Sequence, residues 1–145
     1  MSSFVTSPYL IAILVAWCSA HIFKYVVSVM RDEKHGLKSH LFRSGGMPSS
    51  HSASAVALVT LIGLRDGFET AIFGLGALFA LIVMYDAVKV RRSSGEQGEA
   101  IHSLIKEQKS GIKPPRAAKG HTPFEVVVGA SLGLVIGIVV FLATK

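Results

Sequence analysis

The chain has 145 residues, enough for one domain, and half of them are hydrophobic, while the formal net charge at pH 7 is +6. The hydrophobic residues form long blocks separated by basic segments, which excludes an ordinary soluble domain with a dispersed core. A single cysteine, Cys18, excludes disulfides within the chain. We therefore predict one membrane domain that covers residues 1–145.

The first hydrophobic block covers residues 8–30. It is long enough to cross a hydrocarbon core of ~30 Å, which takes ~20 helical residues. No basic stretch precedes it, and Lys24 is the first charged side chain of the sequence. A retained membrane helix is therefore expected here, rather than a cleaved signal peptide.

The second block, at 53–64, is short, since a helix of this length covers only ~18 Å. Extension back to residue 49 supplies the missing turn, so we predict a helix over 49–64 whose polar start is sunk into protein. His51 would then lie in a cavity lined by other helices, because polar groups at this depth must face protein or water.

The third and fourth blocks, at 68–88 and 122–144, have spanning length. The polar loop between them, 89–121, contains a segment at 96–108 whose apolar residues share one helical stripe. We predict a short amphipathic helix there, on the membrane surface or against the bundle. The fold class is thus an all-α integral membrane protein with four transmembrane helices and one amphipathic helix.

Two small-residue features indicate how these helices pack. Asp66-Gly67 is a tight-turn signal, which predicts an antiparallel hairpin of the second and third helices. On the fourth helix Gly129, Gly133 and Gly137 recur every fourth residue and form a ridge that permits close helix approach. We interpret the ridge first as a packing surface, and also as a candidate contact for a homo-oligomer.

The distribution of positive charge predicts an orientation. Twelve of the fifteen Lys and Arg residues lie between the first and second or between the third and fourth helices. The opposite face keeps Arg65 and the terminal Lys145. The positive-inside rule therefore predicts that the basic loops face the cytoplasm and that both termini lie outside.

Two histidines, His51 and His121, stand at helix starts on the predicted basic face. A helix start offers unpaired N–H groups and the positive end of the helix dipole, which favour a bound phosphate. Before His51, Gly46 lets the backbone approach a ligand closely, and Ser49 and Ser50 can cap the helix or donate to an oxyanion.

Around His121 the sequence reads "GHTPFEVVVG". Thr122, Pro123 and Glu125 form a capping-box signature, which gives Glu125 a structural role. This role leaves His121 unexplained. A histidine in that position can attack phosphorus while a carboxylate fixes its tautomer and a second histidine, His51, protonates the leaving oxygen. Such chemistry requires no metal and no cofactor.

The segments "GGMPSSHSA" and "GHTPFEVVVGASLG" resemble the divergent branch of the type 2 phosphatidic acid phosphatase superfamily, which is related to acid phosphatases and vanadium-dependent haloperoxidases. The resemblance covers 24–137. The superfamily motif Pro-Ser-Gly-His is matched at 48–51, with serine in place of glycine, and the last motif by His121, Glu125 and Gly129. The resemblance implies that His121 is the nucleophile, Glu125 its orienting carboxylate and His51 the general acid.

The superfamily's first motif, Lys-x6-Arg-Pro, is matched in spacing by Lys24 and Arg31, although Asp32 replaces the proline. The resemblance implies that both cations bind phosphate. A lysine on a membrane helix can also simply extend to the surface, and this alternative stays open for Lys24.

The arginine that usually opens the last motif is replaced by Pro115. Arg91 and Arg92 resemble a divergent-branch motif and could bind phosphate in its place. The neighbouring Asp86 is a further candidate site residue. Its structural alternative is pairing with Lys89 or Arg92, because an acid at the end of a membrane helix is costly unless paired.

Two functional hypotheses follow. The first is a membrane phosphatase that hydrolyses a lipid phosphate ester or pyrophosphate, without metal, through a phosphohistidine intermediate. The second is a catalytically silent binding or transport protein that keeps the anion pocket, as the missing arginine suggests. Both predict a lipid phosphate and the membrane as partners, rather than nucleic acid.

Overall fold

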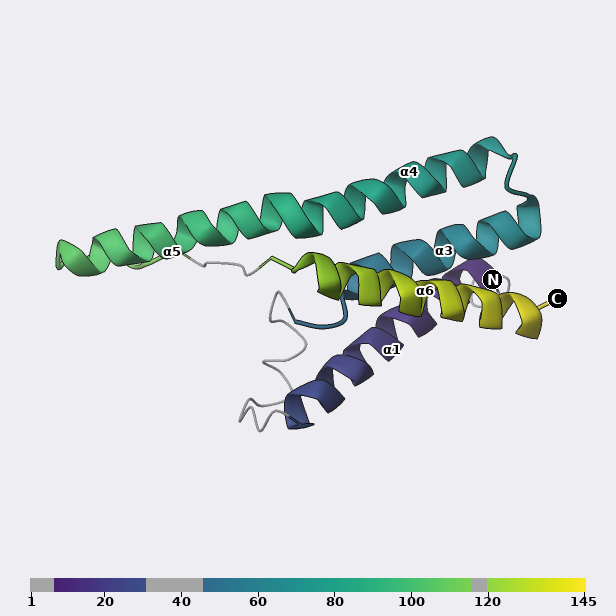
Figure 1. The fold of residues 1–145 in the computed structure, drawn as a ribbon, viewed down its shortest axis with the longest axis horizontal. Coiled ribbons are helices and arrows are strands. Elements are labelled where there is room, and N and C mark those ends of the chain that lie inside the picture. The colour runs from purple at the N-terminus through teal and green to yellow at the C-terminus, as the bar shows by residue number, and fades with distance from the viewer. Residues whose placement is uncertain (1–6, 31–45, 116–119) are drawn as a thin grey trace.

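The computed structural model of the protein describes residues 7–30, 46–115 and 120–145, and every regular element in these ranges is helical (Figure 1). This confirms the all-α class. The elements in chain order are α1 (Pro8–Met30), α3 (Ser50–Asp66), α4 (Ala71–Tyr85), the π-helical segment η1 (Asp86–Val90), α5 (Arg91–Glu107) and α6 (Pro123–Ala143).

Helix α3 lies at the centre of the bundle and packs against α1, α4 and α6, while α1 also contacts α6. Helices α3 and α4 form the predicted antiparallel hairpin (Figure 1). The turn between them uses Gly67 at φ 105°, a conformation that favours glycine, and the Thr70 hydroxyl caps α4.

Hydrogen bonds identify the elements that meet at each end of the bundle. The Tyr9 hydroxyl donates to the Asp66 carboxylate at 2.7 Å, and the Arg65 guanidinium donates to the Thr144 carbonyl at 3.2 Å. The start of α1 and the ends of α3 and α6 therefore share one end. Toward the other end the starts of α3 and α6 are hydrogen-bonded to each other, the residues before α6 are hydrogen-bonded to η1, and α1 slopes away from the bundle (Figure 1).

Three helical runs are long and apolar enough to cross a membrane: Pro8–Met30, Ala71–Glu107 and Pro123–Ala143. A multi-pass membrane protein is thus supported. Helix α3, with 17 residues, falls below that length, in keeping with its short apolar block and its position among the other helices.

The segment after α4 differs from the expected loop. Helix α4 continues through η1 into α5, so the chain stays helical to Glu107 instead of becoming a loop at residue 89. The segment predicted as a separate amphipathic helix is the last part of this run, and its apolar residues Ile101 and Leu104 are exposed. The sequence did not predict this continuation, because the segment is polar and resembles a loop. No side chain caps the start of α5, since the helix continues there from η1.

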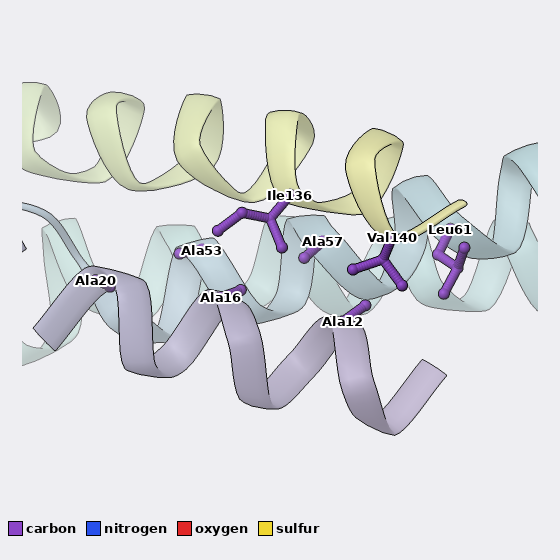
Figure 2. Close-up of a cluster of buried hydrophobic side chains, with 8 residues drawn as sticks. All are labelled: Ala12, Ala16, Ala20, Ala53, Ala57, Leu61, Ile136 and Val140. Carbon is purple, nitrogen blue, oxygen red and sulfur yellow. The ribbon is translucent and has the colours of Figure 1, made fainter. Parts of the chain in front are cut away.

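Small side chains build the core between α1, α3 and α6 (Figure 2). Ala12, Ala16 and Ala20 recur every fourth residue on α1 and are fully buried. Ala53 and Ala57 do the same on α3. Since lipid tails are as apolar as large side chains, close packing of small residues is what holds membrane helices together.

The glycine ridge of α6 packs against α3 of the same chain. A Cβ added at Gly129 would lie 2.5 Å from the Ser49 carbonyl oxygen, and one at Gly133 would meet the Ala53 carbonyl. The predicted packing role of the ridge is therefore confirmed. The ridge is buried against α3 of the same chain, so it does not offer an open surface for the homo-oligomer we also considered.

Candidate active site

A residue at the start of α6, Glu125, contacts the His121 side chain. Thr122 and Glu125 form the predicted capping box, in which the Thr122 N–H donates to Glu125 Oε2 at 3.0 Å. The same Oε2 lies 3.2 Å from His121 Nδ1. Glu125 therefore caps the helix and orients the histidine at once. An ionised carboxylate only accepts, so Nδ1 carries the proton and Nε2 keeps its lone pair.

The backbone around His121 is fixed by the π-helical segment. The His121 N–H donates to the Ala87 carbonyl of η1 at 3.0 Å. Next to it, Gly120 lies so close to Arg92 that an added Cβ would meet the Arg92 backbone nitrogen and Cα. A close backbone approach of this kind requires glycine. The loop before α6 is thus docked on the junction of η1 and α5.

The start of α3 is hydrogen-bonded to the start of α6. Ser49 is fully buried, its N–H donates to the Glu125 carbonyl at 3.1 Å, and its hydroxyl accepts from Ser52 N–H and Oγ. Ser49 therefore acts as the helix cap, the first of its two expected roles. Helix geometry leaves the N–H groups of Ser50 and His51 without intrahelical acceptors, and such groups favour a bound anion.

Lys24 comes to the site from α1. Gly46, at φ 88°, lies beside this side chain, since a Cβ added to it would stand in ordinary van der Waals contact with Lys24 Cε at 3.8 Å. Lys24 is partly buried, and the charge of Glu125 acts on it. Its phosphate role and the surface alternative therefore both stay predictions.

His51 lies on the first turn of α3 and is exposed, so the expectation that it lies in a cavity enclosed by other helices is wrong. The charges of Lys24, Arg91 and Asp86 act on it. His51 and His121 are also within electrostatic reach of each other. The two histidines and Lys24 thus share one region of the protein, where their charges influence one another.

The two arginines after α4 take different partners. Arg91 Nε donates to Asp86 Oδ2 at 2.6 Å, whereas Arg92 Nε donates to Glu96 at 3.1 Å on the exposed side of α5. Our expectation that Lys89 or Arg92 pairs with Asp86 is therefore wrong. The π-helical turn that begins at Asp86 changes the register, so that Arg91 reaches the carboxylate instead.

Burial sets the protonation state of His121. The side chain is 9% exposed, and this desolvation lowers the pKa of His121 below its ordinary value of 6.5. The hydrogen bond and the charge of Glu125 raise the pKa and oppose the effect, while Lys24 and His51 lower it further. Because the pKa lies below its ordinary value, the neutral form of His121 is favoured at pH 7.

Two further points concern Arg31 and metal binding. Arg31, the second cation of the first motif, lies outside the described residues. Within residues 7–30, 46–115 and 120–145, no three His, Cys, Asp or Glu side chains lie close enough together to hold a metal ion.

Sequence reasoning missed two parts of this region. His21 lies one turn before Lys24 on α1, is partly buried, contacts the Trp17 ring at a tilt and acts electrostatically on His51. Its spacing to Lys24 was the available signal. The role of the Ala87 carbonyl could not be predicted, because every residue type offers the same backbone acceptor.

Comparisons with known proteins agree with the site motifs. The family model described as the divergent PAP2 family matches residues 5–136. The chain is similar to the uncharacterized membrane protein YuiD of Bacillus subtilis (strain 168), with 37% identity over 111 residues, covering 66% of this chain and 70% of that protein. No solved structure matches. Since the family model covers most of its length, the chain belongs to the divergent PAP2 family.

Proposed function

We propose that the protein is a membrane phosphatase that hydrolyses a lipid phosphate ester or pyrophosphate through a phosphohistidine at His121, without a metal ion. One observation carries this proposal: His121 is buried, favours its neutral form and is hydrogen-bonded through Nδ1 to Glu125. This arrangement leaves Nε2 as a nucleophile of fixed orientation.

In the first step Nε2 of His121 attacks phosphorus, and the P–N bond forms as the bond to the leaving oxygen breaks. The electron pair moves to that oxygen, which takes a proton from protonated His51. Glu125 stabilises the positive charge that develops on the His121 ring. The alcohol or phosphate of the lipid then leaves.

In the second step water attacks the phosphohistidine and gives a proton to His51, which now acts as a base. The P–N bond breaks, inorganic phosphate leaves and His121 is restored. Lys24 and the free N–H groups at the start of α3 would bind the phosphoryl oxygens, whose charge grows in the transition state. Arg31, if it follows the superfamily motif, would join them.

The alternative is a catalytically silent membrane protein that binds or transports an anion. The Asp86–Arg91 pair favours it, because this ion pair neutralises a cation that would otherwise face the phosphate. The two functions share the anion site and differ in turnover.

The orientation belongs to the same proposal. With four crossings, the site would face the cytoplasm and both termini would lie outside. A Lys113→Cys thiol, placed in a Cys18→Ser background, should resist an impermeant reagent in intact cells and react after lysis. Reaction in intact cells would show that this loop lies outside, which is the opposite topology.

The enzyme proposal is tested with purified protein in detergent, by release of inorganic phosphate from a panel of lipid phosphates and pyrophosphates in the presence of a chelator. The wild type should turn over at least one of them. His121→Ala should fall to background. His51→Ala should lose roughly 10² to 10⁴ in rate, and substrates with better leaving groups should recover part of that loss.

Two results would overturn the proposal. Wild-type protein that binds phosphate or vanadate but turns over no lipid phosphate would establish the binding function instead. Equal activity of His121→Ala and wild type would remove the nucleophile from the mechanism.

A further inference from the structure

Helix α4, the π-helical segment η1 and α5 form one helical run of 37 residues, Ala71–Glu107. At 1.5 Å per residue the run is ~55 Å long, whereas the hydrocarbon core of a membrane is only ~30 Å thick. The α5 end extends beyond the other helices that the structure describes (Figure 1). Because α4 is the apolar part of the run and α5 is polar, α5 projects out of the hydrocarbon region and lipid chains do not cover it.

Uncharged, exposed side chains follow one another along this run at alternating steps of three and four residues. Such steps are the repeat of a seam between two packed helices. The members of this seam are Leu75, Leu78, Ile82 and Tyr85 on α4, Val90 on η1, and Ser94, Gln97, Ile101 and Leu104 on α5. Within residues 7–30, 46–115 and 120–145 no side chain covers the seam, since all of its members are exposed.

The π-helical turn keeps the two halves of the seam on one face. From Tyr85 to Val90 the step is five residues, one more than an α-helical seam would take. The Arg91 N–H donates to the Asp86 carbonyl, which is the i→i+5 bond of a π-helix, so the turn takes up the extra residue. In an uninterrupted α-helix the α5 half would be rotated by ~100° away from the α4 half.

The charge of α5 argues against the membrane surface as the partner of the seam. A helix that lies on anionic headgroups is rich in Lys and Arg on its polar face. Helix α5 carries as many acidic as basic residues, with Glu96, Glu99 and Glu107 against Arg91, Arg92 and Lys106. It also continues the direction of α4 instead of turning along the bilayer (Figure 1). Another helix therefore fits the seam better than a lipid surface does.

A second copy of the chain supplies a helix that matches the seam along its whole length. Copies inserted in one membrane share their orientation and depth, so the two runs are parallel and a two-fold axis places each seam residue opposite its own counterpart. The α5 part alone is only about two heptads long, which is short for a stable pair in water. Together with the α4 part the seam covers about four heptads.

We propose that the protein forms a parallel dimer in which the seam of α4, η1 and α5 packs against the same seam of a second copy. The uncharged Ser94 and Gln97 meet their counterparts without repulsion, while Ile101 and Leu104 lose their contact with water. The dimer does not depend on the phosphatase proposal, because the seam contains none of the candidate catalytic or phosphate-binding residues.

The dimer would nevertheless contact the segment that positions the candidate site. Ala87 of η1 is buried, and its carbonyl accepts from the His121 N–H. Val90 of the same segment is 55% exposed and belongs to the seam. One side of η1 therefore faces the site and another faces the second copy.

Disulfide cross-linking in membranes tests the seam. Single cysteines are placed in a Cys18→Ser background at Leu104 and Gln97, and at Ser103 as the matched control, which is exposed on the same turn as Leu104 but lies off the seam. After mild oxidation, Leu104→Cys and Gln97→Cys should run mainly as linked dimers, because parallel copies place identical seam residues opposite each other. Ser103→Cys should stay mainly monomeric. Equal linking of all three, or none at the seam, would overturn the proposal.

A second measurement needs no cysteine on the seam. Energy transfer between copies labelled at the C-terminus is followed in liposomes as the protein is diluted with lipid. Leu104→Asp should weaken dimerisation by about tenfold or more, because two like charges would face each other across the seam, whereas Ser103→Asp should leave it unchanged. Thermal unfolding checks that both variants fold.

Two outcomes of this measurement would contradict the dimer. One is an equal effect of Leu104→Asp and Ser103→Asp. The other is a wild type that stays monomeric at every density while Leu104→Cys resists a water-soluble maleimide, which would mean that the bilayer or another part of the same chain covers the seam.

Discussion

The middle of the bundle and its polar end are held together in different ways. In the middle, alanines of α1 and the glycine ridge of α6 bring backbones into contact with α3. At the polar end, hydrogen bonds join His121 to Ala87 and Ser49 to Glu125. The difference teaches that small-residue packing sets the positions of the helices, whereas a few backbone acceptors set the position of the chemistry. Stability and activity should therefore respond to different substitutions.

The largest effect is expected in the middle of the bundle. Gly133→Val should lower the free energy of unfolding by roughly 1–3 kcal/mol or more, because its Cβ would meet the Ala53 carbonyl and force α6 away from α3. Gly74→Val on α4 is the matched control, since nothing lies within 4 Å of its Cβ. Denaturant titration in detergent measures both. Equal stability of the two variants would mean that the ridge does not hold the bundle.

How well the sequence predicted this fold depends on the kind of signal. Residues 8–30 became α1 with the predicted bounds, and the Thr122–Glu125 capping box formed as expected, because apolar blocks and caps act locally. The π-helical turn at Asp86 and the continuation into α5 were not predicted. Both are in contact with the loop before α6, which lies about thirty residues away in the sequence, and such long-range contacts leave no local signal.

The site was predicted to the same extent. The resemblance to the superfamily implied that Glu125 orients His121, and the structure places Glu125 Oε2 3.2 Å from His121 Nδ1. The partner of Asp86 was assigned wrongly, because side-chain register changes in a π-helix. The Ala87 carbonyl could not be found from residue types at all.

The second prediction breaks the docking of the polar end. Gly120→Ala should reduce lipid phosphate turnover by about tenfold or more, because the added Cβ meets the Arg92 backbone and moves His121 away from η1. Unfolding stability should fall less than in Gly133→Val. Gly111→Ala, where nothing surrounds the Cβ, is the control and should keep full activity. A Gly120→Ala protein with wild-type turnover would contradict the role given to this contact.

The third prediction concerns pH and has a smaller effect. Burial lowers the pKa of His121, so kcat/KM should fall on the acidic side only below the ordinary histidine value of about 6.5, as His121 gains a proton and loses its nucleophilic lone pair. Glu125 raises the pKa of His121 through its hydrogen bond and its charge. In Glu125→Gln this acidic limb should therefore move to lower pH, and the plateau rate should decrease.

Glu125→Gln also separates the two roles of this carboxylate, since its Oε2 contacts both Thr122 and His121. Glutamine can keep the capping box, so stability should change little. A pH profile that does not shift, combined with a large loss of stability, would show that Glu125 serves the helix cap and not the histidine.

The central claim is that His121 carries the phosphoryl group, and trapping that intermediate tests it most directly. Wild-type protein mixed with a lipid phosphate labelled with ³²P should be quenched in alkali within the first turnovers, digested and mapped by mass spectrometry. The account predicts an acid-labile, alkali-stable phosphate on the peptide that contains His121, increased in His51→Ala when the lipid has a good leaving group, and absent in His121→Ala. Phosphate release without any label on His121, or a label that persists in His121→Ala, would contradict it.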